Sequence, residues 1–278
     1  MSLSVIALAL SAAVLHATWN AVLRTGADRL WTVTVMTLAM TVVAIPFALI
    51  LPLPPAGAWL YLILSSCLQV GYSVFLVAAY RHGELGQVYP IVRGSVPLLV
   101  TLGGFALAGE RLGVLPIIGI ALVALGIMSL ALGKGRATTT SILLALATGL
   151  FIASYTTVDA IGVRETGNPA VYATWICLIY GTLLPATFVI MRGKLTLDLR
   201  SPETLKAIAG GMVSLLAYGA VIAAFALGPV GPITALRETS VVFAALIGRI
   251  FLGETLTVTR VAACIVVAVG AICLGYSQ

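Results

Sequence analysis

The sequence predicts an all-α polytopic membrane protein with ten transmembrane helices, arranged as a 5+5 inverted-topology repeat. Of its 278 residues, 61% are hydrophobic and 9% are charged, whereas an average soluble domain is about 25% charged. The mean hydropathy is +1.15. Long apolar runs follow one another along the chain, and the second half of the sequence repeats the first. A soluble fold of this length could not cover so much apolar surface, so we place the chain in a membrane.

A helix that crosses the hydrocarbon core of a bilayer, about 30 Å thick, needs roughly 20 apolar residues. The first such run lacks the basic start and the small-residue cleavage site of a signal peptide, so we expect it to be retained. The connections are short, and we expect no extramembrane domain. The ten predicted spans are Leu3–Leu23, Trp31–Leu51, Ala58–Tyr80, Gly86–Leu107, Gly113–Leu132, Thr140–Ala160, Pro169–Met191, Glu203–Leu227, Gly231–Phe251 and Leu256–Gly275.

The segment Val92–Leu112 reappears as Leu236–Leu256, and the match continues into the next helix. At one constant offset the pairs are Arg93 with Arg237, Gly109 with Gly253, Glu110 with Glu254, Leu112 with Leu256 and Gly126 with Gly270. The opening helices match more weakly, pairing Ala17 with Ala153, Trp19 with Tyr155 and Gly26 with Gly162. We therefore predict two repeats, residues 1–137 and 138–278. Because each has five helices, the second enters the membrane from the opposite side, which suits a carrier that alternates between inward-open and outward-open states.

The basic residues predict the orientation of the spans. Eleven of the 15 lie in or beside the odd-numbered connections, two lie in the even-numbered ones, and Arg93 and Arg237 lie within spans. By the positive-inside rule the odd-numbered connections are cytoplasmic and both termini face outward. In a membrane chain the net charge of +6 is no sign of nucleic-acid binding.

Small residues inside the spans favour packing roles. The four cysteines have no metal-ligand spacing, and we interpret them as apolar packing residues; they are Cys67, Cys177, Cys264 and Cys273. Small residues also form one stripe on the fifth span and one on the tenth, where they let helix backbones approach closely. These residues are Gly119, Gly126, Gly133, Ala263 and Gly270.

An ionisable side chain inside a span is costly unless it faces a partner or water, so each one is a candidate functional residue. Arg93 and Arg237 are expected at similar depth from opposite faces, and a guanidinium fork suits a carboxylate or phosphate. We predict that one or both bind an anionic substrate group, and Gly94 with two flanking prolines favours a cavity beside Arg93. The alternative is a structural ion pair, because Glu238 follows Arg237 and could pair with Arg93.

Polar and aromatic residues elsewhere in the spans suggest the walls of a cavity. His16, Trp19 and Asn20 share one helix face, since they are spaced at i, i+3 and i+4, and we expect that face to line a cavity or a seam between helices. Pockets commonly combine apolar walls with a few polar anchors. Three deep aromatic residues could form such walls: Tyr155, Trp175 and Tyr218.

The remaining carboxylates are expected to differ in role. Glu238 could carry a coupling proton as well as pair with an arginine. Asp159 lies near the predicted end of its span, so we expect it to reach the membrane interface. Glu110 and Glu254 lie at membrane boundaries beside helix starts, where a carboxylate can cap free N–H groups, and we expect structural roles for both.

The sequence argues against an intramembrane enzyme. It contains two histidines, Asp159 is the only aspartate near a span, and no H-E-x-x-H metal motif is present. No phosphate-binding glycine motif appears, so we expect neither ATP nor any other cofactor, and no metal site.

A Gly-Glu pair follows the fourth span of each repeat, in AGERL (Ala108–Leu112) and in LGETL (Leu252–Leu256). With ten spans in a 5+5 inverted repeat, this chain resembles the drug/metabolite transporter superfamily. Within it the whole chain is similar to the EamA-type metabolite exporters. That resemblance implies a bacterial inner-membrane carrier whose helices surround a central cavity, with the fifth and tenth packed behind it.

The resulting prediction is a monomeric secondary transporter that exports small amphipathic metabolites, with amino acids, including aromatic or hydrophobic ones, as the first expectation. The alternative is a flippase for a lipid-linked sugar, or a carrier of phosphorylated or nucleotide sugars. The substrate and the lipid bilayer are the expected partners, and coupling to protons and facilitated diffusion both stay open.

Overall fold

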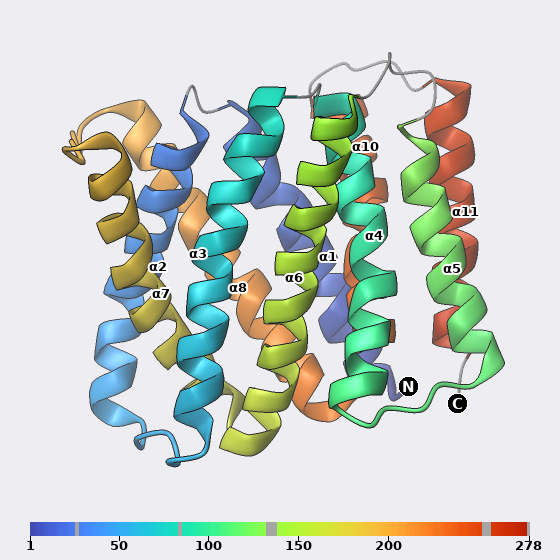
Figure 1. Ribbon diagram of the computed structural model, residues 1–278, viewed down its shortest axis with the longest axis horizontal. Coiled ribbons are helices and arrows are strands. Elements are labelled where there is room, and N and C mark those ends of the chain that lie inside the picture. Colours follow the sequence, from blue (N-terminus) through green and yellow to red (C-terminus); the bar gives the residue numbers. More distant parts are fainter. Residues whose placement is uncertain (26–27, 83–84, 132–137, 252–256, 277–278) are drawn as a thin grey trace.

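The computed structural model describes residues 1–25, 28–82, 85–131, 138–251 and 257–276. In these residues the regular structure is entirely helical (Figure 1). The helices are α1 (Leu3–Thr25), α2 (Arg29–Ile50), α3 (Ala58–His82), α4 (Leu85–Leu107), α5 (Val114–Ser129), α6 (Thr139–Thr166), α7 (Pro169–Arg192), α8 (Pro202–Leu227), α9 (Val230–Glu238), α10 (Ser240–Phe251) and α11 (Val258–Gly275).

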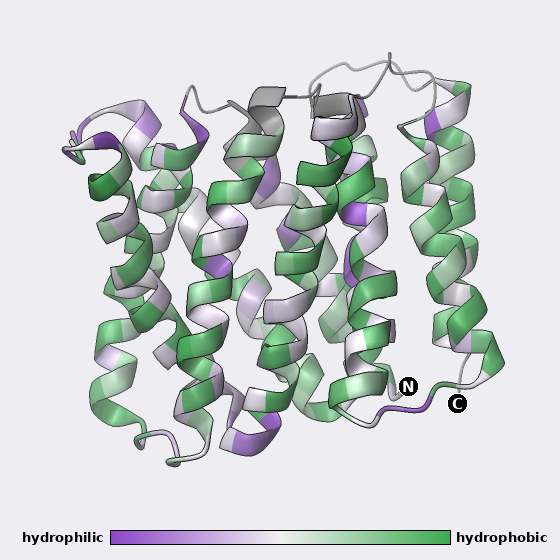
Figure 2. Cartoon of the chain, in the orientation of Figure 1, coloured by the Kyte–Doolittle hydropathy of each residue, from purple (hydrophilic) through white to green (hydrophobic). Residues whose placement is uncertain are grey.

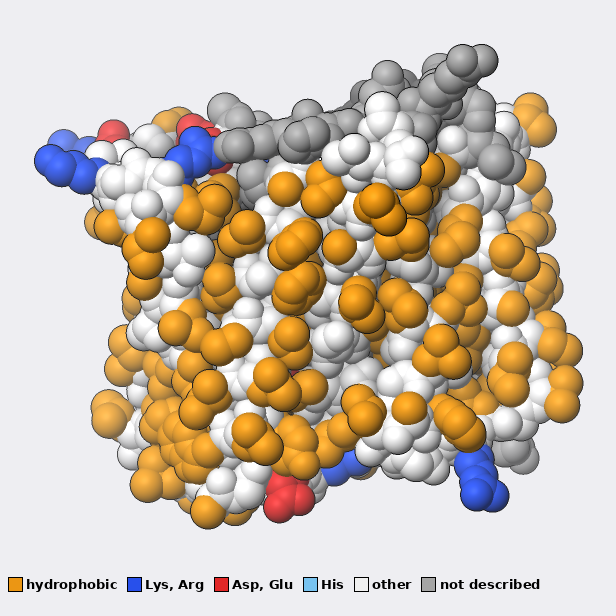
Figure 3. Space-filling model, in the orientation of Figure 1, with side chains coloured by type: hydrophobic (Ala, Val, Ile, Leu, Met, Phe, Trp, Pro, Cys, Tyr) orange, Lys and Arg blue, Asp and Glu red, His pale blue; other side chains and the backbone are white. Residues whose placement is uncertain are grey.

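These segments correspond to the ten predicted spans, because α9 and α10 form one span that is interrupted at Thr239. Among the described residues, nine spans are long and apolar enough to cross a membrane, and α5 is a shorter apolar helix of 16 residues. Apolar side chains cover the face of the bundle seen in Figure 3, and the charged side chains visible there lie at its two ends. Hydrophilic residues within the bundle are confined to a few positions (Figure 2). The prediction of an all-α membrane protein is therefore confirmed.

The interruption at Thr239 was not predicted. The Thr239 backbone N–H donates to the carbonyl of Leu236 at 3.1 Å, and the Thr239 hydroxyl donates to the same oxygen at 2.6 Å. Both bonds reach back three residues instead of four, which tightens the turn. The helix axis can therefore change between α9 and α10 without leaving the Leu236 carbonyl unpaired.

Helix starts follow from capping residues in the sequence. Asp28 accepts hydrogen bonds from the backbone N–H groups of Leu30 and Trp31 and so begins α2. Asn168 begins α7 in the same way, with Pro169 in the first turn, where its missing N–H costs nothing. Short oxygen-bearing side chains are preferred at such positions because they satisfy N–H groups that have no partner inside the helix.

The helix contacts follow the inverted repeat. α3 packs on α6, and the corresponding α8 packs on α1; likewise α4 packs on α6, and α9 packs on α1. α2 pairs with α7, and α5 pairs with α11 at the opposite side of the bundle (Figure 1). Both termini lie at one end of the bundle, as an even number of spans requires. The 5+5 layout is thus confirmed.

The pair formed by α5 and α11 depends on glycine. A Cβ atom on Gly270 would lie 2.8 Å from the carbonyl oxygen of Gly119, and one on Gly126 would lie 2.9 Å from Val267. Both distances are shorter than a carbon side chain tolerates, so the absence of a side chain lets the two backbones touch. The predicted small-residue packing of these helices is present; Gly133 lies outside the described residues.

Candidate functional site

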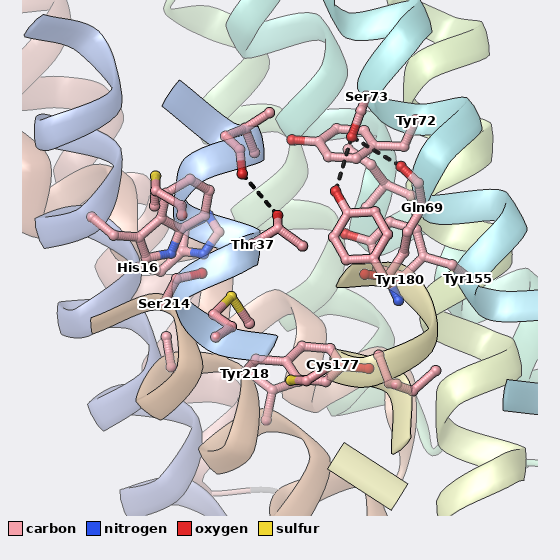
Figure 4. Close-up of a pocket in the computed structure, with 18 of the residues that line it drawn as sticks. His16, Thr37, Gln69, Tyr72, Ser73, Tyr155, Cys177, Tyr180, Ser214 and Tyr218 are labelled. Atoms are coloured by element: carbon pink, nitrogen blue, oxygen red, sulfur yellow. Dashed lines mark hydrogen bonds between the residues drawn. The ribbon is translucent and has the colours of Figure 1, made fainter. Parts of the chain in front are cut away.

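A cavity lies in the middle of the bundle, with about 150 Å³ of space for the centres of water molecules. One water needs about 15 Å³ by this measure, so the cavity has room for a small metabolite. Figure 4 shows side chains from several helices pointing into it. The lining residues are Ala12, His16, Trp19, Arg29, Val33, Met36, Thr37, Met40, Gln69, Tyr72, Ser73, Leu76, Arg93, Ile152, Tyr155, Ile176, Cys177, Tyr180, Ser214, Ala217, Tyr218, Val221 and Arg237.

The cavity extends from the middle of the bundle toward the end opposite the termini. α2 lines it from Met40 to Arg29, the first residue of that helix, which follows the connection from α1. α5 and α11 contribute none of the described lining residues, since they pack on each other at the side.

Arg93, Arg237 and Glu238, called here the arginine cluster, form the charged part of the site. Arg93 Nε lies 3.0 Å from Glu238 Oε2, and Arg237 Nη2 donates to Glu238 Oε1 at 3.1 Å. Glu238 is fully buried, and each arginine is 7% exposed and lines the cavity. Two guanidinium groups share one carboxylate, so the cluster carries one excess positive charge. A buried excess charge is costly, and an anion in the cavity would balance it.

The ion pair weighed as the alternative role of Arg93 is present, and Arg93 also lines the cavity. Besides the ion pair, Arg93 Nη2 donates to Ser240 Oγ at 3.3 Å, and the guanidinium carbon lies 5.7 Å from the centre of the Tyr89 ring. Gly94, in contrast, faces α5: a Cβ atom there would lie 2.9 Å from the carbonyl oxygen of Ala124. The glycine beside Arg93 therefore serves helix packing and is no mark of the cavity.

The aromatic residues divide into lining and packing groups. Trp19, Tyr155 and Tyr218 line the cavity, together with Tyr72 and Tyr180, which the sequence analysis did not single out. The Tyr72 and Tyr155 ring centres lie 6.0 Å apart.

Trp175 does not line the cavity. It packs edge-on against Trp59 with the ring centres 5.0 Å apart.

The polar face of α1 is only partly in the cavity. His16 and Trp19 line it, in edge-to-face contact with their ring centres 4.8 Å apart. Asn20 lies outside it and donates from Nδ2 to the backbone carbonyl of His16 at 2.8 Å. Its amide is therefore engaged within its own helix.

A polar stripe on α3 was missed. Gln69, Tyr72 and Ser73 line the cavity, and Ser65 lies one turn earlier on the same helix face. Gln69 Nε2 donates to Ser65 Oγ at 3.1 Å. The hydroxyls of Ser73 and Tyr180 lie 3.0 Å apart (Figure 4). Polar residues at i, i+4, i+7 and i+8 within an apolar span were the signal that would have found this stripe.

Asp159 is fully buried (1% exposed), so the expectation that it reaches the interface was wrong. It accepts hydrogen bonds from Ser65 on α3, from Tyr172 on α7 at 3.0 Å and from Tyr218 on α8 at 3.0 Å. These four residues, called here the Asp159 cluster, join four helices. Asp159 lies one turn beyond Tyr155 along α6, on the side of the cavity toward the termini.

A second polar cluster lies at the end of the bundle that carries the termini. Arg164 donates to Glu110 Oε1 at 2.7 Å, to the Gly228 carbonyl at 2.6 Å and to the Phe225 carbonyl at 3.0 Å. Glu110 also accepts from the Val230 N–H at 2.9 Å. We call this set the Arg164 cluster. Glu110 thus caps α9, a helix of the other repeat, and joins the two halves; Glu254 lies outside the described residues.

Comparison with known proteins identifies the family. The sequence matches the EamA-like transporter family over residues 3–132 and again over residues 139–276. The chain belongs to the EamA-like transporter family. The members of this family are membrane transporters of small molecules, so the central cavity of this EamA-like transporter has the place expected of a substrate site.

The fold of the EamA-like transporter also occurs in solved structures. One, titled only "Crystal structure of protein", has a TM-score of 0.79 and 22% sequence identity, and the alignment covers 98% of this chain and 96% of that one. A search among curated proteins gave no match.

Proposed function

We propose that this transporter exports small amphipathic metabolites, and that amino acids with aromatic or hydrophobic side chains are its substrate class. The observation that carries the proposal is the excess positive charge of the arginine cluster beside a cavity with aromatic walls. An amino acid is complementary to both features. Its carboxylate would bind Arg93 and Arg237, and its side chain would pack against Tyr72, Tyr155 and the neighbouring rings.

We further propose that transport proceeds by alternating access. The cavity extends toward the end opposite the termini, whereas the Asp159 and Arg164 clusters lie between it and the termini. The basic residues predict that the end toward which the cavity extends is cytoplasmic, in the inner membrane of a bacterium. In that orientation the cavity takes its substrate from the cytoplasm. The described cavity is lined by one chain, so a monomer suffices.

The test is counterflow in liposomes that contain the purified protein. Radiolabelled phenylalanine, threonine and a sugar phosphate are compared, for the wild type, Arg93→Ala and Arg93→Lys. Hydrogen bonds to a charged group contribute about 1.5–3 kcal/mol, so Arg93→Ala should weaken phenylalanine binding by about 10- to 100-fold. Arg93→Lys keeps the charge without the fork and should be intermediate. Arg111→Ala, which removes an exposed arginine from the connection between α4 and α5, is the matched control.

The outcomes separate the parts of the proposal. Exchange of phenylalanine that is weakened in folded Arg93→Ala supports both the substrate class and the anchor. Normal exchange by Arg93→Ala contradicts the anchor, and exchange of the sugar phosphate alone contradicts the substrate class. If none of the three solutes exchanges, the amino-acid proposal fails and a lipid-linked sugar is tested in the same vesicles.

A further inference from the structure

Asp159 is a buried carboxylate that neither the packing nor the arginine cluster explains. Its three hydrogen-bond donors are the hydroxyls of Ser65, Tyr172 and Tyr218, all of them neutral. Among the described residues it forms no ion pair. A carboxylate in the interior of a membrane protein is costly without a cation, and binding a proton removes that cost.

The groups that face Asp159 come from several helices. α7 presents Tyr172 and Cys177, α8 presents Tyr218, and α6 itself presents Tyr155. The cation that acts on it from α9 is Arg237, which is already bound to Glu238.

The two remaining helices beside Asp159, α3 and α4, present uncharged residues at its depth in the bundle. α3 presents Ser65, and α4 packs on this part of α6 through Gly103 beside Thr157. Asp159 is therefore a carboxylate surrounded by hydroxyl and thiol groups.

The local sequence maintains this arrangement. A Cβ atom on Gly162 would lie 2.5 Å from Tyr172 Cε2 and 2.7 Å from the Tyr172 hydroxyl. The absence of a side chain one turn beyond Asp159 is therefore what lets Tyr172 reach the carboxylate.

Asp159 is one side chain away from the cavity. Tyr218 lines the cavity and donates its hydroxyl hydrogen to Asp159 Oδ2 at 3.0 Å. On the other side of the carboxylate, Ser65 connects through Gln69 to the polar stripe of α3. A rearrangement of Tyr218 would therefore bring Asp159 into contact with water or substrate in the cavity.

We propose that Asp159 is a proton-binding site, and that proton binding and substrate binding exclude each other there, so that the transporter is a proton antiporter. The proposal rests on the proposed amino-acid substrate. With the carboxylate of an amino acid at Arg93 and Arg237, its ammonium group would lie toward Tyr218. A positive charge there favours the ionised form of Asp159, and the proton leaves to the water of the cavity.

The same proton affects the closed end of the bundle. An ionised carboxylate only accepts hydrogen bonds, whereas a protonated one also donates. With the hydrogens of Ser65, Tyr172 and Tyr218 already directed at Asp159, the arrival of a proton forces at least one of these bonds to rearrange. Because the bonds join α3, α6, α7 and α8, proton binding weakens the contacts between the cavity and the end with the termini.

Gradient-driven transport tests the coupling. Liposomes with the wild-type protein are prepared with an acidic interior, the membrane potential is held at zero, and uptake of the solute that shows counterflow is measured. For a one-for-one exchange, a difference of one pH unit allows accumulation up to about tenfold. Asp159→Asn, which cannot bind the proton, should only equilibrate the solute. Asp198→Asn, in the exposed connection between α7 and α8, is the matched control and should accumulate it as the wild type does.

Each other outcome contradicts the proposal. Accumulation with an acidic exterior would make the coupling symport, and no accumulation with either gradient would make the protein a facilitator. Accumulation by Asp159→Asn would mean that another residue binds the proton.

A second measurement needs no substrate and therefore separates this proposal from the amino-acid proposal. Infrared difference spectra during a pH titration in lipid should contain a band of a protonated carboxyl group that Asp159→Asn lacks and Asp198→Asn retains. Tyr218→Phe should shift this band by removing one hydrogen bond. If the band is absent from the wild type, or persists in folded Asp159→Asn, Asp159 is not the proton site, whichever solute is transported.

Discussion

We predict that the Arg164 cluster keeps the cavity closed toward the end of the bundle that carries the termini. We expect Arg164→Ala to open that end more often, because Arg164 joins the end of α6 to Glu110 and to the turn between α8 and α9. The substitution removes three hydrogen bonds: those to Glu110, Phe225 and Gly228. Glu110 keeps its bonds to the Val230 N–H.

The size of the effect follows from exposure. Hydrogen bonds to charged groups contribute about 1.5–3 kcal/mol when buried. The Arg164 side chain is 33% exposed, so we take about 0.5–1 kcal/mol for each bond, in the range of solvent-exposed ion pairs. The sum is about 2 kcal/mol, which corresponds to a shift of about 30-fold in the ratio of open to closed molecules.

Cys177 provides the assay, because it lines the cavity. With the other three cysteines changed to alanine, a membrane-impermeant thiol reagent is applied from the side of the termini. The rate of Cys177 modification should rise about 30-fold in Arg164→Ala. It should stay at the wild-type value in Arg111→Ala, which removes an exposed arginine from the same end of the bundle.

Two results would refute this reasoning. A rate for Arg164→Ala within about threefold of the wild type would mean that the cluster does not hold the end closed. An equal rise in Arg111→Ala with a cationic reagent would mean that the loss of a positive charge attracts the reagent, and that the hydrogen bonds of Arg164 are not the cause.

Two further predictions concern stability. Glu238→Gln leaves the guanidinium groups of Arg93 and Arg237 buried without their carboxylate and should destabilise the fold by about 3–5 kcal/mol. Thermal unfolding in detergent measures this loss, with Glu203→Gln, at the exposed start of α8, as the control. Equal melting temperatures for the two variants would contradict the shared ion pair. Gly270→Val places side-chain carbon against the backbone of α5 and should cost about 1–3 kcal/mol with an unchanged KM, since α11 does not line the cavity. A changed KM at an unchanged melting temperature would contradict a purely packing role for α5 and α11.

The number of spans and their symmetric arrangement could be predicted, because the sequence carries a pattern for each. Apolar runs of sufficient length predict the helices, and the duplicated motif around Arg93 and Arg237 predicts their symmetric arrangement. The sequence also indicated the two arginines, since an arginine that cannot lose its charge needs a buried partner wherever the span is placed.

The position of Asp159 was misjudged because the end of its helix was misplaced. The prediction ended the span at Ala160, whereas α6 continues to Thr166. The true end is marked by Gly167, which has a φ of +69° and terminates the helix, followed by Asn168, which caps α7. Together these two residues indicate a helix end that lies about two turns beyond Asp159.

The interruption at Thr239 had no such local signal. No proline or glycine lies beside Thr239, and the neighbouring Ser240 is held by Arg93 from another helix. Likewise, the role of Glu110 as a cap for α9 depends on residues far apart in the sequence. Such features follow from tertiary contacts, so neither could be predicted from one segment alone.

The difference between α4 and its counterpart has a consequence for the whole molecule. At the offset that pairs Arg93 with Arg237, Ser95 pairs with Thr239, and each hydroxyl donates to the carbonyl three residues earlier. Yet α4 runs unbroken from Leu85 to Leu107, while the equivalent span is divided. The two equivalent segments therefore have different backbone shapes in the same molecule. Under the proposed alternating access, an exchange of these two backbone shapes between the halves would break α4 at Ser95, join α9 to α10, and give the opposite state of the carrier.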